Sequence, residues 1–207
     1  ASLIKKSLIK AYKFNPDIIC LPECANIMTA NKSHLVKHAT LQKDCPVLEE
    51  CIQFAKKYNK FVSVGSLLLK KNNSSKLLNR SFFINHSGKI MAYYDKIHLF
   101  DVNINRKEVH RESKSFHKGN KVVIITSPWG KIGLTICYDI RFPNLYRNLV
   151  KQGVKIILVP AAFTVPTGKD HWEILLRSRA IENTSFIIAT GQCGKHHARR
   201  ATYGHSM

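Results

Sequence analysis

The 207-residue sequence has no long hydrophobic run, no paired cysteines and few acidic residues. Its longest apolar stretches, such as 154–159, are far shorter than the roughly 20 residues of a membrane-spanning helix. No charged-then-apolar leader opens the chain, so we expect a protein that is neither secreted nor embedded in a membrane. The six cysteines lack the Cys-x-x-Cys spacing of zinc sites and the density of a disulfide scaffold. They predict reduced thiols in a cytoplasmic protein.

The scarcity of acidic residues gives the chain a large positive net charge. Asp and Glu number 13 against 33 Lys and Arg, which gives a formal charge of +20 at pH 7. Such an excess can indicate nucleic acid, an acidic membrane surface or an anionic substrate. The lysines, however, are spread along the whole sequence and are not interleaved with stacking aromatic residues. We therefore expect a solvated basic surface, with neither nucleic acid nor membrane as partner.

Apolar residues alternate between helical and strand-like spacing, which predicts a layered α/β fold. The length and an apolar content of 44% favour a single domain over 1–207 with one good core. Segment 101–119 has no periodicity and is expected to be a long loop, a kind of segment that is commonly functional. The expected helices are 1–14, 47–58, 143–152 and 172–183, and the expected strands are 17–21, 61–69, 81–85, 89–94, 121–126, 131–137, 155–159 and 185–190.

Three apolar runs each end at one reactive side chain, namely Glu23, Lys96 and Cys137. Strand ends in α/β sheets collect functional groups. A carboxylate, a cation and a soft nucleophile together could cleave a carbon-nitrogen bond through a thioester. Each residue alone has a plain structural interpretation, because an isolated cysteine, for example, is more often a buried core residue. The combination of the three favours catalysis.

The roles of the three residues follow from their chemistry. Cys137 is expected at a strand-to-helix elbow, where a helix N-terminus and a nearby cation would lower the pKa of its thiol. No histidine has a local signature that links it to Cys137, so Glu23 is the candidate base. Glu23 could take the thiol proton, protonate the leaving amine and activate water. Lys96 and the backbone N–H after Cys137 would face the developing oxyanion.

Three motifs around these residues resemble those of the nitrilase, or carbon-nitrogen hydrolase, superfamily, which uses a Glu-Lys-Cys triad. One short match would be weak, but three matches in the right order are strong. The resemblance covers essentially the whole chain, and 171–182 and 191–207 are similar to the Nit branch, which hydrolyses ω-amides of short dicarboxylate-like compounds. The motifs are Leu21-Pro22-Glu23, Tyr94-Asp95-Lys96-Ile97-His98 and Gly133-Leu134-Thr135-Ile136-Cys137-Tyr138-Asp139-Ile140-Arg141-Phe142-Pro143.

The resemblance implies a four-layer α-β-β-α sandwich, no cofactor, and a homodimer or higher homo-oligomer. The second glutamate of the family maps onto Glu112, which would orient Lys96. Glu108 is a nearby alternative, and Glu112 could also be a solvated loop acid. No metal is expected, because the histidines at 171, 196, 197 and 205 lack a spaced set of cysteine or acidic partners.

Four residues are predicted to bind the substrate. Arg141 could hold a substrate carboxylate in the fork geometry of its guanidinium, or could equally form a salt bridge to Asp139. Tyr138 adjoins the nucleophile in the third motif. Phe163 and Thr164 resemble the segment that lines the pocket of the family, although they could equally be ordinary loop residues.

Both ends of the chain differ from the family pattern. Members open with a β-strand before the first helix and continue with further strands past Gly-His-Ser, so we expect a fragment or an incompletely represented protein. The leading hypothesis is a thiol-dependent amidase that cleaves a small carboxylate-bearing amide, such as deaminated glutathione, through a thioester with release of ammonia. The alternatives are a truncated, inactive nitrilase-like protein or basic binding module, and a nitrilase or N-carbamoyl hydrolase of another branch.

Overall fold

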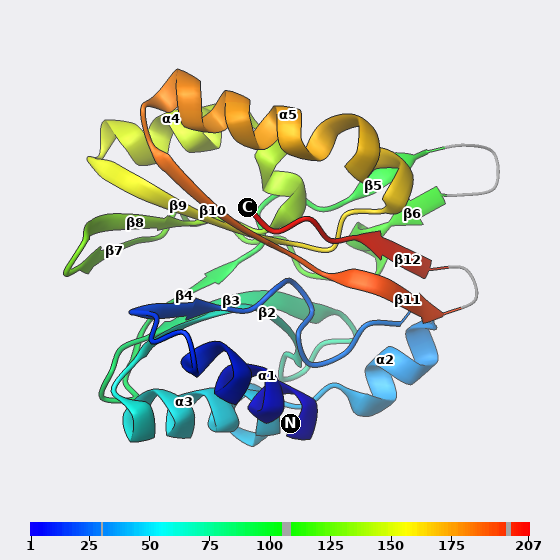
Figure 1. Ribbon diagram of the computed structural model, residues 1–207. Coiled ribbons are helices and arrows are strands. Elements are labelled where there is room, and N and C mark those ends of the chain that lie inside the picture. Colours follow the sequence, from blue (N-terminus) through cyan, green and yellow to red (C-terminus); the bar gives the residue numbers. More distant parts are fainter. Residues whose placement is uncertain (30, 105–108, 198–199) are drawn as a thin grey trace.

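Two four-stranded β-sheets face each other, and helices cover the outer side of each sheet (Figure 1). The computed structural model describes residues 1–29, 31–104, 109–197 and 200–207. The layers run α-β-β-α, which confirms the predicted sandwich. No helix of the described ranges is long and apolar enough to cross a membrane.

The first sheet has the strand order β1-β2-β3-β4. These strands are β1 Ile18–Cys20, β2 Phe61–Lys70, β3 Leu77–Ile84 and β4 Ile90–Asp95. Strand β1 pairs with β2 in parallel, and the other pairs are antiparallel. The outer helices are α1 Ser2–Tyr12 and α3 Pro46–Tyr58. Strand β2 is buried along nearly its whole length, as its continuous apolar run predicts for a strand covered on both faces.

The second sheet has the order β10-β9-β8-β7, and β8, β9 and β10 are parallel. Its strands are β7 Ile124–Ser127, β8 Gly130–Leu134, β9 Val154–Ala161 and β10 Phe186–Gly191. Helices α4 Pro143–Lys151 and α5 Val165–Asn183 cover it. Phe83 and Tyr94 of the first sheet share a buried core with Ile132, Leu134 and Ile157 of the second, so the inner faces pack directly together.

Several short elements were not predicted. They are α2 Lys32–His38, the hairpin of β5 Asp101–Asn103 and β6 Val109–Arg111, the hairpin of β11 Cys193–His197 and β12 Arg200–Tyr203, and three 3₁₀ turns, Gln42–Asp44, Glu112–Lys114 and Cys137–Arg141. The loop predicted over 101–119 thus contains short elements, β5, β6 and one of the 3₁₀ turns, in its described part. Strands of three residues are too short to show an alternating pattern.

Two helix predictions also need correction. Helix α5 begins at Val165 rather than near 172, because a proline in its first turn is compatible with a helix start. In α1, Leu8 is buried as expected, but Leu3 is 77% exposed. The short helix contacts the core along a narrow stripe of its surface, so only some of its apolar side chains are buried.

Candidate active site

Cys137 lies just past strand β8, at the start of the 3₁₀ turn Cys137–Arg141. Its φ of 50° is in the left-handed region, which is uncommon for a residue other than glycine. The buried Asp139 side chain holds this elbow: Oδ2 accepts hydrogen bonds from Ile136 N at 2.8 Å and Tyr94 Oη at 2.7 Å. Its Oδ1 accepts a bond from His98 N at 2.9 Å. The nucleophile candidate is thus anchored to the Lys96 motif by one carboxylate.

An Asp139→Ala substitution is expected to lower the free energy of unfolding by about 3 kcal/mol, because it leaves several buried donors without an acceptor. Thermal or urea unfolding followed by circular dichroism measures the change. Asp170→Ala is the matched control, since Asp170 is exposed on α5. Equal unfolding midpoints for the two variants would contradict this account of the elbow.

Glu23 follows β1 and is positioned by an irregularity in the neighbouring strand β2, between Val64 and Leu67. There, Ser66 O accepts a bond from Ala25 N at 2.8 Å, and Ser66 Oγ accepts one from Cys24 N at 3.0 Å. Gly65 is required at this point because a Cβ would collide with the carbonyl oxygen of Leu21. The Glu23 side chain is consequently held inside the protein, only 4% exposed.

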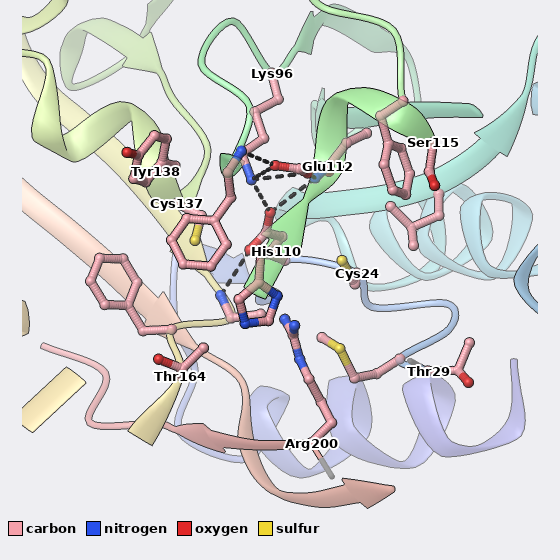
Figure 2. Close-up of a pocket in the computed structure, with 18 of the residues that line it drawn as sticks. Cys24, Thr29, Lys96, His110, Glu112, Ser115, Cys137, Tyr138, Thr164 and Arg200 are labelled. Atoms are coloured by element: carbon pink, nitrogen blue, oxygen red, sulfur yellow. Dashed lines mark hydrogen bonds and ion pairs between the residues drawn. The ribbon is translucent and has the colours of Figure 1, made fainter. Parts of the chain in front are cut away.

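Lys96 follows β4 and is 2% exposed. Its backbone N–H donates to Asn79 O at 3.0 Å, and its carbonyl accepts from Gly119 N at 2.8 Å, so both sides of the lysine are fixed. The Nζ atom lies 2.9 Å from Glu23 Oε1 and 2.9 Å from Glu112 Oε2. One ammonium therefore bridges two carboxylates, as Figure 2 shows for Lys96 and Glu112.

Further hydrogen bonds reach the carboxylate oxygens of Glu23 and Glu112. Asn79 Nδ2 donates to Glu23 Oε1 at 2.9 Å and to Glu112 Oε1 at 3.3 Å. Ala162 N donates to Glu23 Oε2 at 2.9 Å, and Phe100 N donates to Glu112 Oε2 at 2.6 Å. Buried charges need this kind of hydrogen-bonding shell to stay ionised. Glu112 is thus a member of the buried cluster rather than a solvated loop acid.

The cluster sets the protonation of its members. Burial raises the pKa of Glu23, but attraction to Lys96 and hydrogen bonds from Lys96, Cys137 and Asn79 outweigh it, so this pKa lies below its usual value. Burial lowers the pKa of Lys96, but Glu112 and Glu23 raise it well above its usual value. The stable pair is a carboxylate with an ammonium.

The thiol of Cys137 behaves differently from the prediction. Burial raises its pKa well above the usual value, and the Glu23 carboxylate adds to this rise, while Lys96 opposes it. The expected lowering by a helix N-terminus was wrong, because the buried carboxylate and the loss of water dominate over the short 3₁₀ turn. Cys137 therefore rests as a protonated thiol in the same cavity wall as the Glu23 carboxylate.

A cavity of about 250 Å³ opens onto this cluster. Glu23, Lys96, Glu112 and Cys137 lie in its wall, and so do the predicted substrate-binding residues Tyr138, Phe163 and Thr164. The mixture of apolar and charged walls is typical of a site for a small molecule.

Arg141 stands outside this wall. Its Nη2 donates to His171 Nδ1 at 3.1 Å, and its guanidinium lies over the rings of Tyr138 and Phe163, with centroid distances of 5.9 and 5.6 Å. The alternative salt bridge to Asp139 is not formed, because Asp139 binds Ile136, Tyr94 and His98. The other alternative from the sequence, Glu108, lies outside the described residues.

Three residues of the site were missed from the sequence: Asn79, Asp139 and Arg200. Asn79 is a polar residue at a fully buried position of β3, a pattern that could have drawn attention to it. Asp139 stands in the third motif but was considered only as a partner of Arg141. Arg200 lines the cavity from β12 without any local signal. The described residues contain no group of His, Cys, Asp or Glu that could hold a metal ion.

Comparisons with known proteins identify the family of the chain. The family profile described as carbon-nitrogen hydrolase matches residues 1–207. The deaminated glutathione amidase of Yersinia enterocolitica is 40% identical over 203 residues, which are 96% of this chain and 70% of that protein. The Dictyostelium discoideum enzyme of the same name is 39% identical over 209 residues, which are 98% of this chain and 72% of that protein.

Solved structures give the same result. The crystal structure of the C. elegans NitFhit protein superposes with a TM-score of 0.90 at 36% identity, over 98% of this chain and 50% of that one. A Saccharomyces cerevisiae member of branch 10 of the nitrilase superfamily gives a TM-score of 0.84 at 28% identity, over 98% and 73% of the two chains. The chain therefore belongs to the carbon-nitrogen hydrolase family, as a hydrolase of the amidase type.

Proposed function

We propose that the protein is a thiol-dependent amidase in which Cys137 attacks the carbonyl carbon of a small amide. Glu23 accepts the thiol proton as the Sγ–C bond forms. The carbonyl oxygen gains negative charge, which Lys96 Nζ and the backbone N–H of Tyr138 stabilise. The observation that carries the proposal is that Cys137 shares one cavity wall with a buried carboxylate, Glu23, whose Oε1 lies 2.9 Å from Lys96 Nζ.

The second half of the reaction uses the same residues. Glu23 gives its proton to the amide nitrogen, the C–N bond breaks, and the acyl group remains on Cys137 as a thioester. Glu23 then takes a proton from water, whose oxygen attacks the thioester. The C–Sγ bond breaks, the carboxylic acid leaves, and Glu23 returns the proton to the sulfur of Cys137. Glu112 keeps Lys96 in place throughout. A primary amide releases ammonia, whereas a substituted amide releases an amine.

The proposed substrate is a small amide that bears a carboxylate, and deaminated glutathione is the first candidate because similar enzymes carry that name. Its scissile nitrogen belongs to cysteinylglycine, so the product is this dipeptide rather than the ammonia expected from sequence. Incubation with deaminated glutathione, followed by chromatography of cysteinylglycine, tests the proposal. Ammonia release from α-ketoglutaramate tests the primary amide. Turnover of nitriles or N-carbamoyl compounds alone would contradict the assignment.

We further propose that the chain forms the homo-oligomer predicted from sequence. Ile174 and Ile181 lie two turns apart on one face of α5 and are 67% and 78% exposed, and the neighbouring Phe186 of β10 is 75% exposed. Large exposed apolar residues on one outer face are typical of an interface. The cytoplasmic location stays a prediction.

Ile181→Lys is expected to convert the oligomer to a monomer, because it places a charge within this apolar face. Size-exclusion chromatography with light scattering measures the mass. Leu3→Lys is the control, since Leu3 is comparably exposed at 77% but belongs to α1 of the opposite layer. A monomeric wild-type protein, or an unchanged mass for Ile181→Lys, would count against this interface.

A further inference from the structure

Arg200 brings a positive charge into the cavity that no described residue neutralises. It projects from β12 and forms part of the cavity wall. Its Nε atom is buried without a hydrogen-bond partner. None of the ion pairs or hydrogen bonds among the described residues involves its side chain. Figure 2 shows the guanidinium reaching into the pocket on the side of the view away from Lys96.

The other charged groups of the cavity wall already have partners. The described wall contains two carboxylates, Glu23 and Glu112, and Lys96 Nζ lies 2.9 Å from each of them. Ala162 N donates to Glu23 Oε2 at 2.9 Å, and Phe100 N donates to Glu112 Oε2 at 2.6 Å. Both carboxylates are thus committed to the catalytic cluster rather than to Arg200.

A second arginine in the wall, Arg111, differs from Arg200 because its side chain already has hydrogen-bond partners. Its Nη1 donates to Val102 O at 3.1 Å and to His110 O at 2.7 Å, and its Nη2 donates to Asn103 Oδ1 at 2.7 Å. These bonds tie Arg111 into the β5–β6 hairpin. Arg200 is therefore the cavity arginine whose donors remain available to a ligand.

We propose that Arg200 binds the carboxylate of the amide substrate and so selects for anionic amides, an inference that rests on the proposed amidase function. A buried guanidinium nitrogen without a partner is unfavourable, and the planar fork of the guanidinium matches a carboxylate through two parallel hydrogen bonds. Arg200 takes the role that the sequence suggested for Arg141, which stands behind the wall. The carboxylate belongs either to the acyl part of the substrate or to its leaving amine.

Matched substrates distinguish these two sources. The first pair is deaminated glutathione and its derivative with a carboxamide in place of the glycine carboxylate, which tests the amine side. The second pair is glutaramate and its methyl ester, which tests the acyl side. We measure kcat/KM for each compound with the wild type, with Arg200→Gln and with Arg177→Gln. Arg177 is the control because it is exposed on α5 and pairs with Glu173.

Arg200→Gln is expected to lower kcat/KM by about 10- to 100-fold for the free-carboxylate member of one pair and little for the member in which that carboxylate is masked, since a charge-assisted pair is lost. Arg177→Gln leaves both values unchanged. A loss that is equal for the two members in both pairs, or no loss in either pair, would overturn the role of Arg200. The pair that responds identifies which carboxylate it holds.

Binding separates this inference from the amidase proposal. Calorimetry with wild-type protein compares glutarate with its dimethyl ester, and requires no turnover. We expect glutarate to bind and the diester to bind at least about 10-fold more weakly, with the preference lost in Arg200→Gln and partly kept in Arg200→Lys. An active enzyme without this preference would refute the acyl-side role of Arg200 alone, and the first substrate pair decides the amine-side role. Glutarate binding without any amide turnover would refute the amidase proposal alone.

Discussion

A Cys137→Ala variant is expected to lose kcat/KM by at least about 10⁴-fold while keeping its fold, because the proposed reaction runs through a bond to this sulfur. The side chain is small and 7% exposed, so its removal leaves only a minor cavity. The Glu23–Lys96–Glu112 cluster remains paired in the variant. Activity should therefore fall without a matching fall in stability.

Steady-state assays on deaminated glutathione and thermal unfolding of the same preparations measure the two effects. Cys193→Ser is the matched control, since Cys193 is an exposed free cysteine of β11. A second variant, Cys24→Ala, separates the two thiols of the cavity wall. If Cys24→Ala abolished turnover and Cys137→Ala did not, the nucleophile would be assigned wrongly.

Lys96→Met is expected to abolish activity and to lower the free energy of unfolding by about 3–5 kcal/mol at neutral pH, because it leaves the buried Glu23 and the partly buried Glu112 without their shared cation. Lys96 lies 2.9 Å from both Glu23 and Glu112 and is 2% exposed. A methionine of similar length keeps the shape of the site. The loss is therefore electrostatic rather than a packing defect.

The pH dependence of this loss has a definite sign. In the wild type the pKa of Glu23 is lowered from 4.5, so its ionised form stabilises the fold above that pH and the contribution is lost as the pH falls further. In Lys96→Met the unpaired, buried carboxylate has a raised pKa and destabilises the fold only when ionised. The stability difference between the two proteins should shrink in acid.

Urea unfolding at a series of pH values from neutral to about 4.5 measures this difference. Lys89→Met serves as the control, because Lys89 is exposed at the β3–β4 turn. A difference that stays constant over this range, or grows in acid, would contradict the electrostatic explanation.

The sequence predicted the sandwich and the positions of Glu23, Lys96 and Cys137 because these depend on local signals. Long apolar runs mark β2 and β9, and each reactive residue directly follows such a run or a hairpin. Strand ends in a layered α/β fold meet at shared edges. Local spacing was therefore sufficient to suggest that the three residues come together.

The rest depends on contacts between distant segments. Asn79 reaches Glu23 from 56 positions away, and nothing near Arg200 in the sequence indicates that it faces the cavity. The pKa of the Cys137 thiol was predicted in the wrong direction because its burial beside Glu23 is a property of the packed structure. Short elements such as α2 and β5 gave no periodic pattern.

The central claim is that the acyl group of the substrate is carried by Cys137, and mass spectrometry of the quenched enzyme tests it most directly. Wild-type protein is mixed with excess deaminated glutathione, acid-quenched during the first turnovers, digested and analysed. We predict that the peptide containing Cys137 gains the mass of the acyl group, that hydroxylamine removes it as a hydroxamate, and that Cys137→Ala yields neither adduct nor hydroxamate. An acyl adduct on a different residue, or undiminished hydroxamate from Cys137→Ala, would contradict the account.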